Sequence, residues 1–239
     1  LPVDADPIIE TAKKKDIIVV EDAAEVIGLK YKNRNCGGLG DISTFSFYAN
    51  KHITTGEGGM ILTDDDKIAK NCRSSRNLCF QKDIRFVHER IGWNFRMTNL
   101  QAAIGLAQLE QLDDFVKFKR KLGKKYTELL NSCHNLQLPI PETEFAQNVY
   151  WVYGVVLSDD FKYNASQIIT KLRNKNIGSR PFFHPMHLQP VFRKMGFFKS
   201  EVHPNSERLS KQGFYLPCGL GTKESDVSRV AKVLCQTLN

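Results

Sequence analysis

The sequence predicts an α/β fold with a mostly parallel sheet in the first half of the chain and a smaller α+β domain after it. Helical and strand patterns alternate through the first half, which is typical of helices layered on a parallel sheet. Residues 17–20, four apolar residues in a row, have the composition of a buried central strand. After Pro139 and Pro141 the pattern changes, which indicates a second domain.

The first elements lead to a pair of carboxylates. A helix is predicted over residues 6–15, because Pro7 suits the first turn of a helix. The apolar strand 17–20 then ends in Glu21 and Asp22. Open α/β sheets bind their ligands at the carboxyl ends of strands, so these two residues mark a candidate site.

Two more strands and a helix are expected next. The strands are predicted over residues 42–48 and 60–62. A helix should begin at the acidic cluster 64–66, because negative charge stabilises a helix amino terminus.

A capping box predicts the start of a long helix. Thr98 and Gln101 have the spacing of such a box and precede a run of helical apolar periodicity. We expect this helix to run toward Leu130, with Gly123 as a candidate interruption, and we expect the domain boundary near 111–135.

The second half should contain a strand over residues 149–157, a helix over 166–175 and a closing amphipathic helix over 223–238. The predicted domains are therefore 1–120 and 121–239.

Composition restricts the class of protein. With 239 residues, 41% of them hydrophobic, the chain can bury a substantial core. It has no apolar run near the roughly 18 residues that span a bilayer, and its first residues lack a signal peptide pattern. A soluble cytoplasmic protein without membrane contact is expected.

The six cysteines form no Cys-x-x-Cys pair, so we expect reduced thiols and no metal site.

The net charge of +8 could attract nucleic acid, an anionic membrane or a phosphorylated small molecule. The basic residues are scattered, and the densest run, residues 117–121, falls on a predicted helix. We interpret that run as a solvated helix face, so a nucleic acid partner is not expected.

Lys51 follows a predicted strand and precedes a glycine-rich turn, residues 54–59. An amine held in a cleft loses its proton more readily than one in bulk water, and the unprotonated form attacks aldehydes. A surface lysine before a hairpin loop has the same spacing, so spacing alone leaves both interpretations open.

Several segments together resemble one family at consistent spacing, and the resemblance runs in order toward the carboxyl terminus. The family is the DegT/DnrJ/EryC1/StrS sugar aminotransferases, and the matching segments are Glu21-Asp22-Ala23-Ala24-Glu25, Gly40-Asp41-Ile42-Ser43-Thr44-Phe45-Ser46-Phe47, Tyr48-Ala49-Asn50-Lys51, Thr54-Thr55-Gly56-Glu57-Gly58-Gly59 and Gly92-Trp93-Asn94-Phe95-Arg96-Met97. The resemblance implies a three-layer α/β/α pyridoxal-phosphate transferase large domain, of which residues 1–120 are the remaining part.

The resemblance also implies roles for site residues. Lys51 would form the Schiff base with pyridoxal 5'-phosphate and carry the proton during transfer. Asp22 would keep the pyridine nitrogen protonated, and Ser46 would hold the phosphate. Asn94 would reach the same phosphate from the neighbouring subunit, which implies a homodimer with shared active sites. From the residues alone, Asp22 could instead face solvent or cap a helix, and Ser46 could be structural.

Three further residues are candidates with open alternatives. Glu25 stands where many relatives carry Gln or His near the cofactor ring hydroxyl, and a surface glutamate fits the position equally. Residues 180–190 resemble the substrate loop of members that aminate carbon 4 of a 4-keto-6-deoxy sugar, the perosamine synthases among them. Its His184 and His187 could contact the substrate or be merely packed.

Lys51 argues against the dehydratase branch of the family, whose members have histidine in place of the lysine.

The implied activity is transfer of an amino group from an amino acid, expected to be L-glutamate, to a nucleotide-linked 4-keto-6-deoxy sugar in amino-sugar and polysaccharide biosynthesis. The chain begins where relatives are already well into the large domain, before which they have a phosphate-binding loop and an aromatic residue that stacks on the cofactor. We therefore expect a fragment that is inactive and poorly soluble alone. The alternative is a truncated family member that serves only as a binding or dimerisation module.

Overall fold

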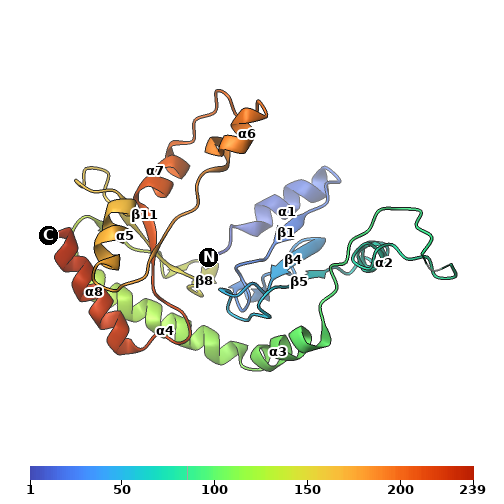
Figure 1. The fold of residues 1–239 in the computed structure, drawn as a ribbon, viewed down its shortest axis with the longest axis horizontal. Helices are drawn as coiled ribbons and strands as arrows, with labels where there is room; N and C mark the ends of the chain where they lie inside the picture. Colours follow the sequence, from blue (N-terminus) through green and yellow to red (C-terminus); the bar gives the residue numbers. More distant parts are fainter. Residues whose placement is uncertain (85) are drawn as a thin grey trace. The chain divides into compact units, whose positions relative to one another are not determined.

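The structure is a computed structural model that describes residues 1–84 and 86–239 (Figure 1). They form two compact units, here called the amino-terminal unit (Leu1–Lys117 with Glu142–Trp151) and the carboxyl-terminal unit (Phe118–Pro141 with Val152–Asn239). The segment Glu142–Trp151 thus returns to the first unit. The functional division into a cofactor-binding domain, 1–120, and a small domain, 121–239, stays a prediction.

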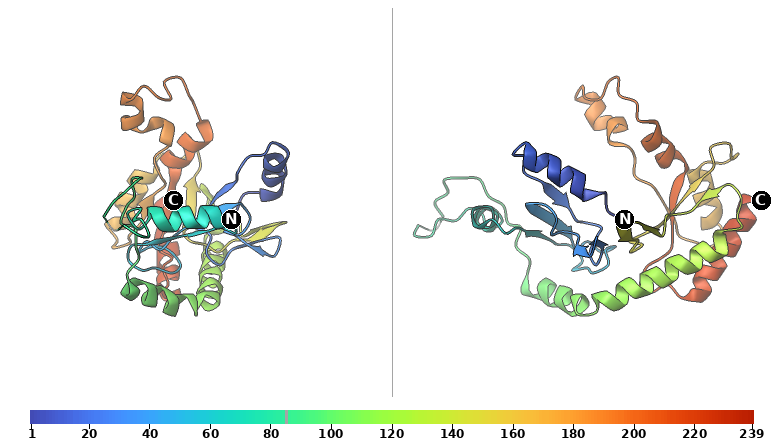
Figure 2. Two further views of the ribbon diagram at one scale, coloured as in Figure 1. Left: turned by 90° about the vertical axis from the view of Figure 1, so that its right-hand side faces the viewer. Right: turned by 180° about the vertical axis from the view of Figure 1, so that it is seen from behind.

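The amino-terminal unit contains a sheet in the order β1-β4-β5. β1 (Val20–Asp22) runs parallel to β4 (Ile42–Ser46), and β4 runs antiparallel to β5 (Gly59–Leu62). Figures 1 and 2 show α1 (Ala5–Lys14) on one side of this sheet. The parallel pair is the feature that positions the candidate site, because both of its strands end at the same edge.

The predicted buried strand 17–20 is wrong in extent and in burial. β1 begins only at Val20, and the side chains of Ile17, Ile18 and Val20 are 57%, 65% and 64% exposed. The physical reason is that β1 is an edge strand of a small sheet, and the described residues provide no layer that covers these side chains.

Two helix starts agree with the predicted caps. α2 (Asp66–Ser75) begins after Asp65, whose carboxylate accepts a hydrogen bond from the amide of Ile68 at 2.8 Å. α3 (Asn99–Leu109) begins with the Thr98–Gln101 capping box, in which the Gln101 amide donates to Thr98 Oγ1 at 3.2 Å. Both caps satisfy amides that a helix leaves without partners, so the local sequence is sufficient to place them.

The single long helix predicted to reach Leu130 is wrong, because α3 ends at Leu109 and α4 (Leu112–Leu130) starts separately. The Gln111 amide bonds to the Gln108 carbonyl at 3.0 Å, a tighter turn than an α-helix allows. Gly123 lies inside α4 and does not interrupt it, since a helical glycine costs only about 1 kcal/mol.

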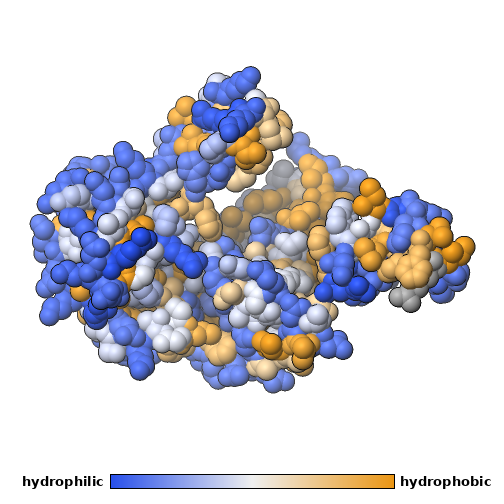
Figure 3. All heavy atoms as spheres, in the orientation of Figure 1, coloured by the Kyte–Doolittle hydropathy of each residue, from blue (hydrophilic) through white to orange (hydrophobic). Residues whose placement is uncertain are grey.

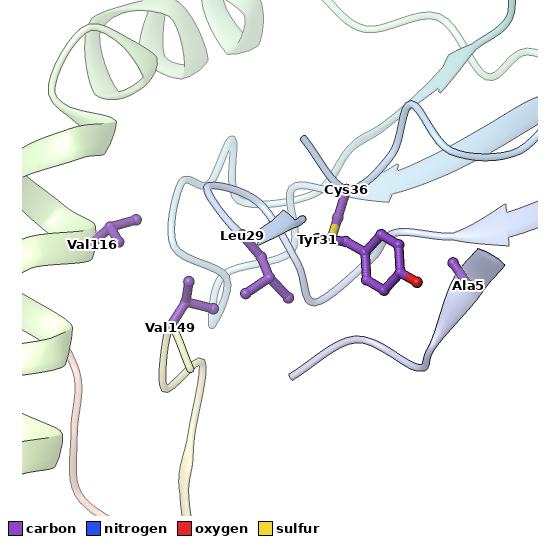
Figure 4. Packing of buried hydrophobic residues seen from close by; sticks show 6 residues of the cluster. All are labelled: Ala5, Leu29, Tyr31, Cys36, Val116 and Val149. Atoms are coloured by element: carbon purple, nitrogen blue, oxygen red, sulfur yellow. The ribbon is translucent and has the colours of Figure 1, made fainter. Parts of the chain in front are cut away.

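The core of the amino-terminal unit lies beside its short hairpins (Figure 4). The hairpins are β2 (Lys30–Tyr31) with β3 (Arg34–Asn35) and β7 (Glu142–Thr143) with β8 (Ala146–Gln147). Distant parts of the chain meet in one buried cluster, whose members are Ala5, Leu29, Tyr31, Cys36, Val116 and Val149. Val149 therefore fixes the returning segment to this unit.

The carboxyl-terminal unit is built on an antiparallel sheet in the order β10-β11-β9-β6. Its strands are β6 (Leu136–Gln137), β9 (Tyr153–Leu157), β10 (Arg180–Pro181) and β11 (Gly213–Leu216). Its helical elements, besides the second part of α4, are α5 (Ala165–Arg173), η1 (Met186–Leu188), α6 (Pro190–Lys194), α7 (Pro204–Gln212) and α8 (Glu224–Leu238).

The predicted helices 166–175 and 223–238 are confirmed as α5 and α8, and α8 buries the apolar stripe that its periodicity indicated. The strand predicted over 149–157 begins only at Tyr153. Tyr150 has φ of 48°, a left-handed conformation that no strand continues through.

The prediction of six reduced thiols is wrong, because Cys133 and Cys235 are joined as a disulfide with their Cα atoms 5.5 Å apart. They are separated by 102 residues, so their spacing in the sequence gave no sign of the pair.

Within the described residues, no helix has the length and hydropathy needed to cross a membrane.

Candidate active site

The candidate site starts from the parallel pairing of β1 and β4. Asp22, the last residue of β1, is in register with Thr44, and the amide of Ala23 donates to the Thr44 carbonyl at 2.9 Å. β4 ends two residues later at Ser46. Parallel strands end at the same edge of a sheet, so Asp22 lies at the edge from which the loop that carries Lys51 leaves.

The side chain of Lys51 is only 9% exposed although it lies in a loop. Its amide donates to the Tyr48 carbonyl at 3.0 Å, which closes a turn just after β4. Its Nζ atom lies 3.2 Å from Glu25 Oε1 and 4.1 Å from the centroid of the Trp151 ring. The amine is thus enclosed by a carboxylate and an aromatic face and is shielded from bulk water.

The two neighbouring carboxylates at the end of β1 have different environments. Glu21 accepts hydrogen bonds from the amides of Gly37 at 2.6 Å and Leu39 at 3.0 Å. Asp22 is exposed, and its Oδ1 accepts a hydrogen bond from the amide of Ala24 at 3.1 Å. Glu21 therefore fastens the turn before β4, whereas Asp22 presents its carboxylate outward at the strand end.

Ser46 is half-buried, and its Oγ accepts a hydrogen bond from the amide of Tyr48 at 3.3 Å. This contact uses the oxygen as an acceptor, and a serine hydroxyl also has a proton to donate. Ser46 can therefore orient toward an anionic group without giving up its contact in the loop.

The glycine-rich turn is held by hydrogen bonds from α3. Gln108 Nε2 donates to the Thr54 carbonyl at 2.7 Å, while Gln108 Oε1 accepts from the Thr54 amide at 3.1 Å. Gln101 Nε2 donates to the Glu57 carbonyl at 3.0 Å. The turn that follows Lys51 is thereby fixed to a helix.

Comparison with known proteins identifies the family that these features belong to. Residues 1–235 match the DegT/DnrJ/EryC1/StrS aminotransferase family. GDP-perosamine synthase of Caulobacter vibrioides is 38% identical over 235 residues, which are 98% of this chain and 62% of the relative. The chain belongs to the DegT/DnrJ/EryC1/StrS aminotransferase family.

Solved structures agree with this assignment. The aminotransferase TlmJ from Streptoalloteichus hindustanus superposes with a TM-score of 0.88 at 26% identity, over 99% of this chain and 63% of TlmJ. The structure of DesI in the presence of its TDP-sugar product superposes with a TM-score of 0.85 at 26% identity, over 99% of this chain and 59% of DesI. The chain thus spans about three fifths of the length of the relatives it matches.

Family membership confirms the predicted resemblance and the α/β fold of pyridoxal-phosphate-dependent sugar aminotransferases. The family is one of aminotransferases, which are transferases that use pyridoxal phosphate. The residues present fit that cofactor, because Lys51 supplies a shielded amine, Asp22 an exposed carboxylate and Ser46 a hydroxyl. Asp22 ends β1, Ser46 ends β4, and Lys51 lies in the loop that follows β4.

The hydrogen bonds that the structure gives for Asn94, His184 and His187 are with residues other than Asp22, Ser46 and Lys51. Asn94 is exposed and accepts a hydrogen bond from Arg96 Nε at 2.8 Å. His184 is exposed with Nε2 3.3 Å from the Leu188 carbonyl. His187 is buried, with Nε2 2.9 Å from a carboxylate oxygen of Glu207. Their predicted roles toward cofactor and substrate stay predictions.

Two residues at the site were not predicted from the sequence. Trp151 covers the Lys51 amine, and buried His52 has Nε2 3.2 Å from the Val149 carbonyl. Trp151 and Asn50 are 101 residues apart, so no local spacing could join them. The only signal was an aromatic residue at the start of a predicted strand.

Among the described residues, no cluster of three or more His, Cys, Asp or Glu could hold a metal ion.

Proposed function

We propose that the protein containing this chain transfers an amino group from an amino acid, L-glutamate, to a nucleotide-linked 4-keto-6-deoxy sugar. It uses pyridoxal 5'-phosphate and acts in the cytoplasm in amino-sugar and polysaccharide biosynthesis. The observation that carries the proposal is the amine of Lys51, 9% exposed and enclosed at the carboxyl edge of a parallel strand pair.

The chain's own residues divide the work of such a reaction. When bound, the cofactor supplies an electron-withdrawing ring next to the carbon that loses or gains the amino group. Lys51 Nζ is the base that removes the proton at that carbon and later returns it. The Asp22 carboxylate holds a proton on the ring nitrogen, and the Ser46 hydroxyl donates to a phosphate oxygen.

Amination at carbon 4 is supported by the relatives and by the loop 180–190. GDP-perosamine synthase is the name of the relative that is 38% identical to the chain. In the proposal, His184 and His187 bind the sugar or the nucleotide, and Glu25 lies beside the cofactor ring as well as beside Lys51.

We also propose a homodimer in which Asn94 of one subunit reaches the phosphate bound by the other. Support comes from the residues around Asn94, because Ile91 is 83%, Trp93 51% and Phe95 72% exposed. Figure 3 shows apolar side chains at the surface of this unit. An exposed apolar patch of this kind is typical of a surface that binds another protein.

The test uses the complete protein purified with pyridoxal phosphate. Borohydride reduction followed by peptide mass spectrometry should find the cofactor on Lys51, and Lys51→Ala should fold but lose both label and transamination. Lys30→Ala, at an exposed lysine of the same unit, is the control and should keep both.

Turnover is then measured with glutamate and with GDP-, dTDP- and UDP-linked 4-keto-6-deoxy sugars, and with the corresponding 3-keto sugars. Label on another lysine would contradict the site, and turnover only with 3-keto sugars would contradict the carbon assignment. A complete protein that neither retains the cofactor nor turns over would support the alternative of a binding or dimerisation module.

A further inference from the structure

Residues 149–151, here called the strap, contact each of the three consecutive residues 50–52. Trp151 Nε1 donates to the Asn50 carbonyl at 3.0 Å. The Trp151 ring centroid lies 4.1 Å from Lys51 Nζ, and His52 Nε2 lies 3.2 Å from the Val149 carbonyl. One short segment thus contacts the backbone before Lys51, the Lys51 amine and the side chain after it.

The strap has a defined conformation. Tyr150 adopts φ of 48°, which turns the backbone between Val149 and Trp151. Its amide donates to Asn148 Oδ1 at 2.7 Å, and the side chains of Val149 and Tyr150 are 2% and 5% exposed. A left-handed tyrosine persists only where the surroundings hold it, and here burial and a side-chain hydrogen bond hold it.

We propose that Trp151 is a positioning residue for the amine of Lys51, an inference that rests on the proposed function. The face of an indole ring attracts an ammonium group, and the hydrogen bond to Asn50 fixes the ring against the loop that carries Lys51. Glu25 contacts the same amine at 3.2 Å. The ring and the carboxylate together restrict a side chain that would otherwise sample many rotamers.

Restricting the amine has a chemical consequence. A reacting group that is already held in place has less rotational freedom to lose, and small displacements of such a group lower rates strongly. The ring also covers the amine, which is why a loop lysine is only 9% exposed. Trp151 acts through Lys51 in this proposal and does not itself take part in proton transfer.

The first experiment needs neither cofactor nor substrate. The complete protein without cofactor is treated with a limiting amount of acetic anhydride, and the acetylation rate of Lys51 is measured by peptide mass spectrometry relative to Lys30. Trp151→Ala should raise the rate at Lys51 by about threefold to tenfold, because the amine loses its cover and its attraction to the ring. Trp151→Phe, which keeps a ring but loses the hydrogen bond to Asn50, should have a rate between those of the wild type and Trp151→Ala.

A matched control exists in the carboxyl-terminal unit. Lys171 Nζ lies 3.6 Å from the centroid of the Tyr163 ring. Tyr163→Ala removes an aromatic ring from a lysine elsewhere and should leave the acetylation rate of Lys51 unchanged. Circular dichroism and thermal unfolding check that each variant folds. If Trp151→Ala does not fold, Trp151→Phe still tests the proposal.

The second experiment measures transamination by the loaded complete protein. Trp151→Ala should lower kcat by about tenfold or more while KM for the amino donor changes by less than about twofold, and Trp151→Phe should recover most of kcat. Wild-type kcat together with wild-type acetylation of Lys51 in both variants would overturn the proposal. If the wild-type protein carries the cofactor on a different lysine, the proposed function fails, and the acetylation rates still decide whether Trp151 positions Lys51.

Discussion

The Nζ atom of Lys51 lies 3.2 Å from Oε1 of Glu25, and this ion pair joins the loop after β1 to the loop after β4. Glu25 is 44% exposed, so water competes for its charge. Ion pairs of this kind contribute little to stability, and their main effect here is to orient the amine.

Glu25→Ala should therefore change the free energy of unfolding by no more than about 1 kcal/mol. It should still slow cofactor attachment to Lys51, because the amine loses an orienting partner. Glu25→Gln keeps an acceptor oxygen of similar reach and should retain more of the attachment rate. Denaturant unfolding and borohydride trapping of the complete protein measure the two effects, and a large loss of stability would contradict an orienting role.

Asp22→Asn should lower transamination by several orders of magnitude while leaving the cofactor attached at Lys51. An amide cannot hold a proton on the pyridine nitrogen as a carboxylate does. The measurements are kcat of the loaded complete protein and borohydride labelling of the same sample. Near-normal turnover would mean that Asp22 serves only to cap the turn at Ala24.

Glu21→Gln should destabilise the protein by about 1–3 kcal/mol, because a Gln NH₂ group cannot accept from the amides of Gly37 and Leu39 as the carboxylate does. Urea unfolding measures the change. Glu10→Gln, at an exposed glutamate of α1, is the matched control and should have little effect. Equal stability of both variants would show that Glu21 does not hold the turn.

Gly40→Ala should cost about 1–3 kcal/mol of unfolding free energy, since a Cβ atom at Gly40 would lie 2.8 Å from the backbone carbonyl oxygen of Val19. That contact lies just before β1 and β4 and cannot relax by side-chain rotation. Gly178→Ala is the control, because nothing lies within 4 Å of its Cβ position. If both variants unfold at the same denaturant concentration, the prediction that a Cβ atom at Gly40 destabilises the protein is wrong.

The contacts of Glu207 should make the stability of the protein depend on pH. The hydrogen bond to His187, followed by that to the backbone of His203, holds the pKa of Glu207 below its ordinary value of 4.5. A lowered carboxyl pKa contributes stability that is present at neutral pH and is lost as the pH falls below about 4.5 through the folded-state value. Thermal unfolding of wild type and Glu207→Gln between pH 6 and pH 3 should show a smaller decline in the variant. Parallel declines would contradict this assignment.

The sequence by itself determined the features that depend on nearby residues. The caps of α2 and α3 arise from Asp65 and from the Thr98–Gln101 box, whose hydrogen bonds span three residues. Several motifs in order along the chain, from residues 21–25 to residues 92–97, were enough to recognise the family, since the residue types and spacing of each are local features of the sequence. Hydrogen bonds between residues three or four apart form within one turn, so a local pattern encodes them.

Only the tertiary structure decided which distant groups meet. The sequence placed Glu21 and Asp22 side by side, but packing of the turn before β4 gave Glu21 its two amides and left Asp22 exposed. Trp151 lies over Lys51, and Cys133 joins Cys235, because folding brings together segments about a hundred residues apart. Such contacts depend on how whole elements pack, and that information is spread over the chain rather than contained in any one window of it.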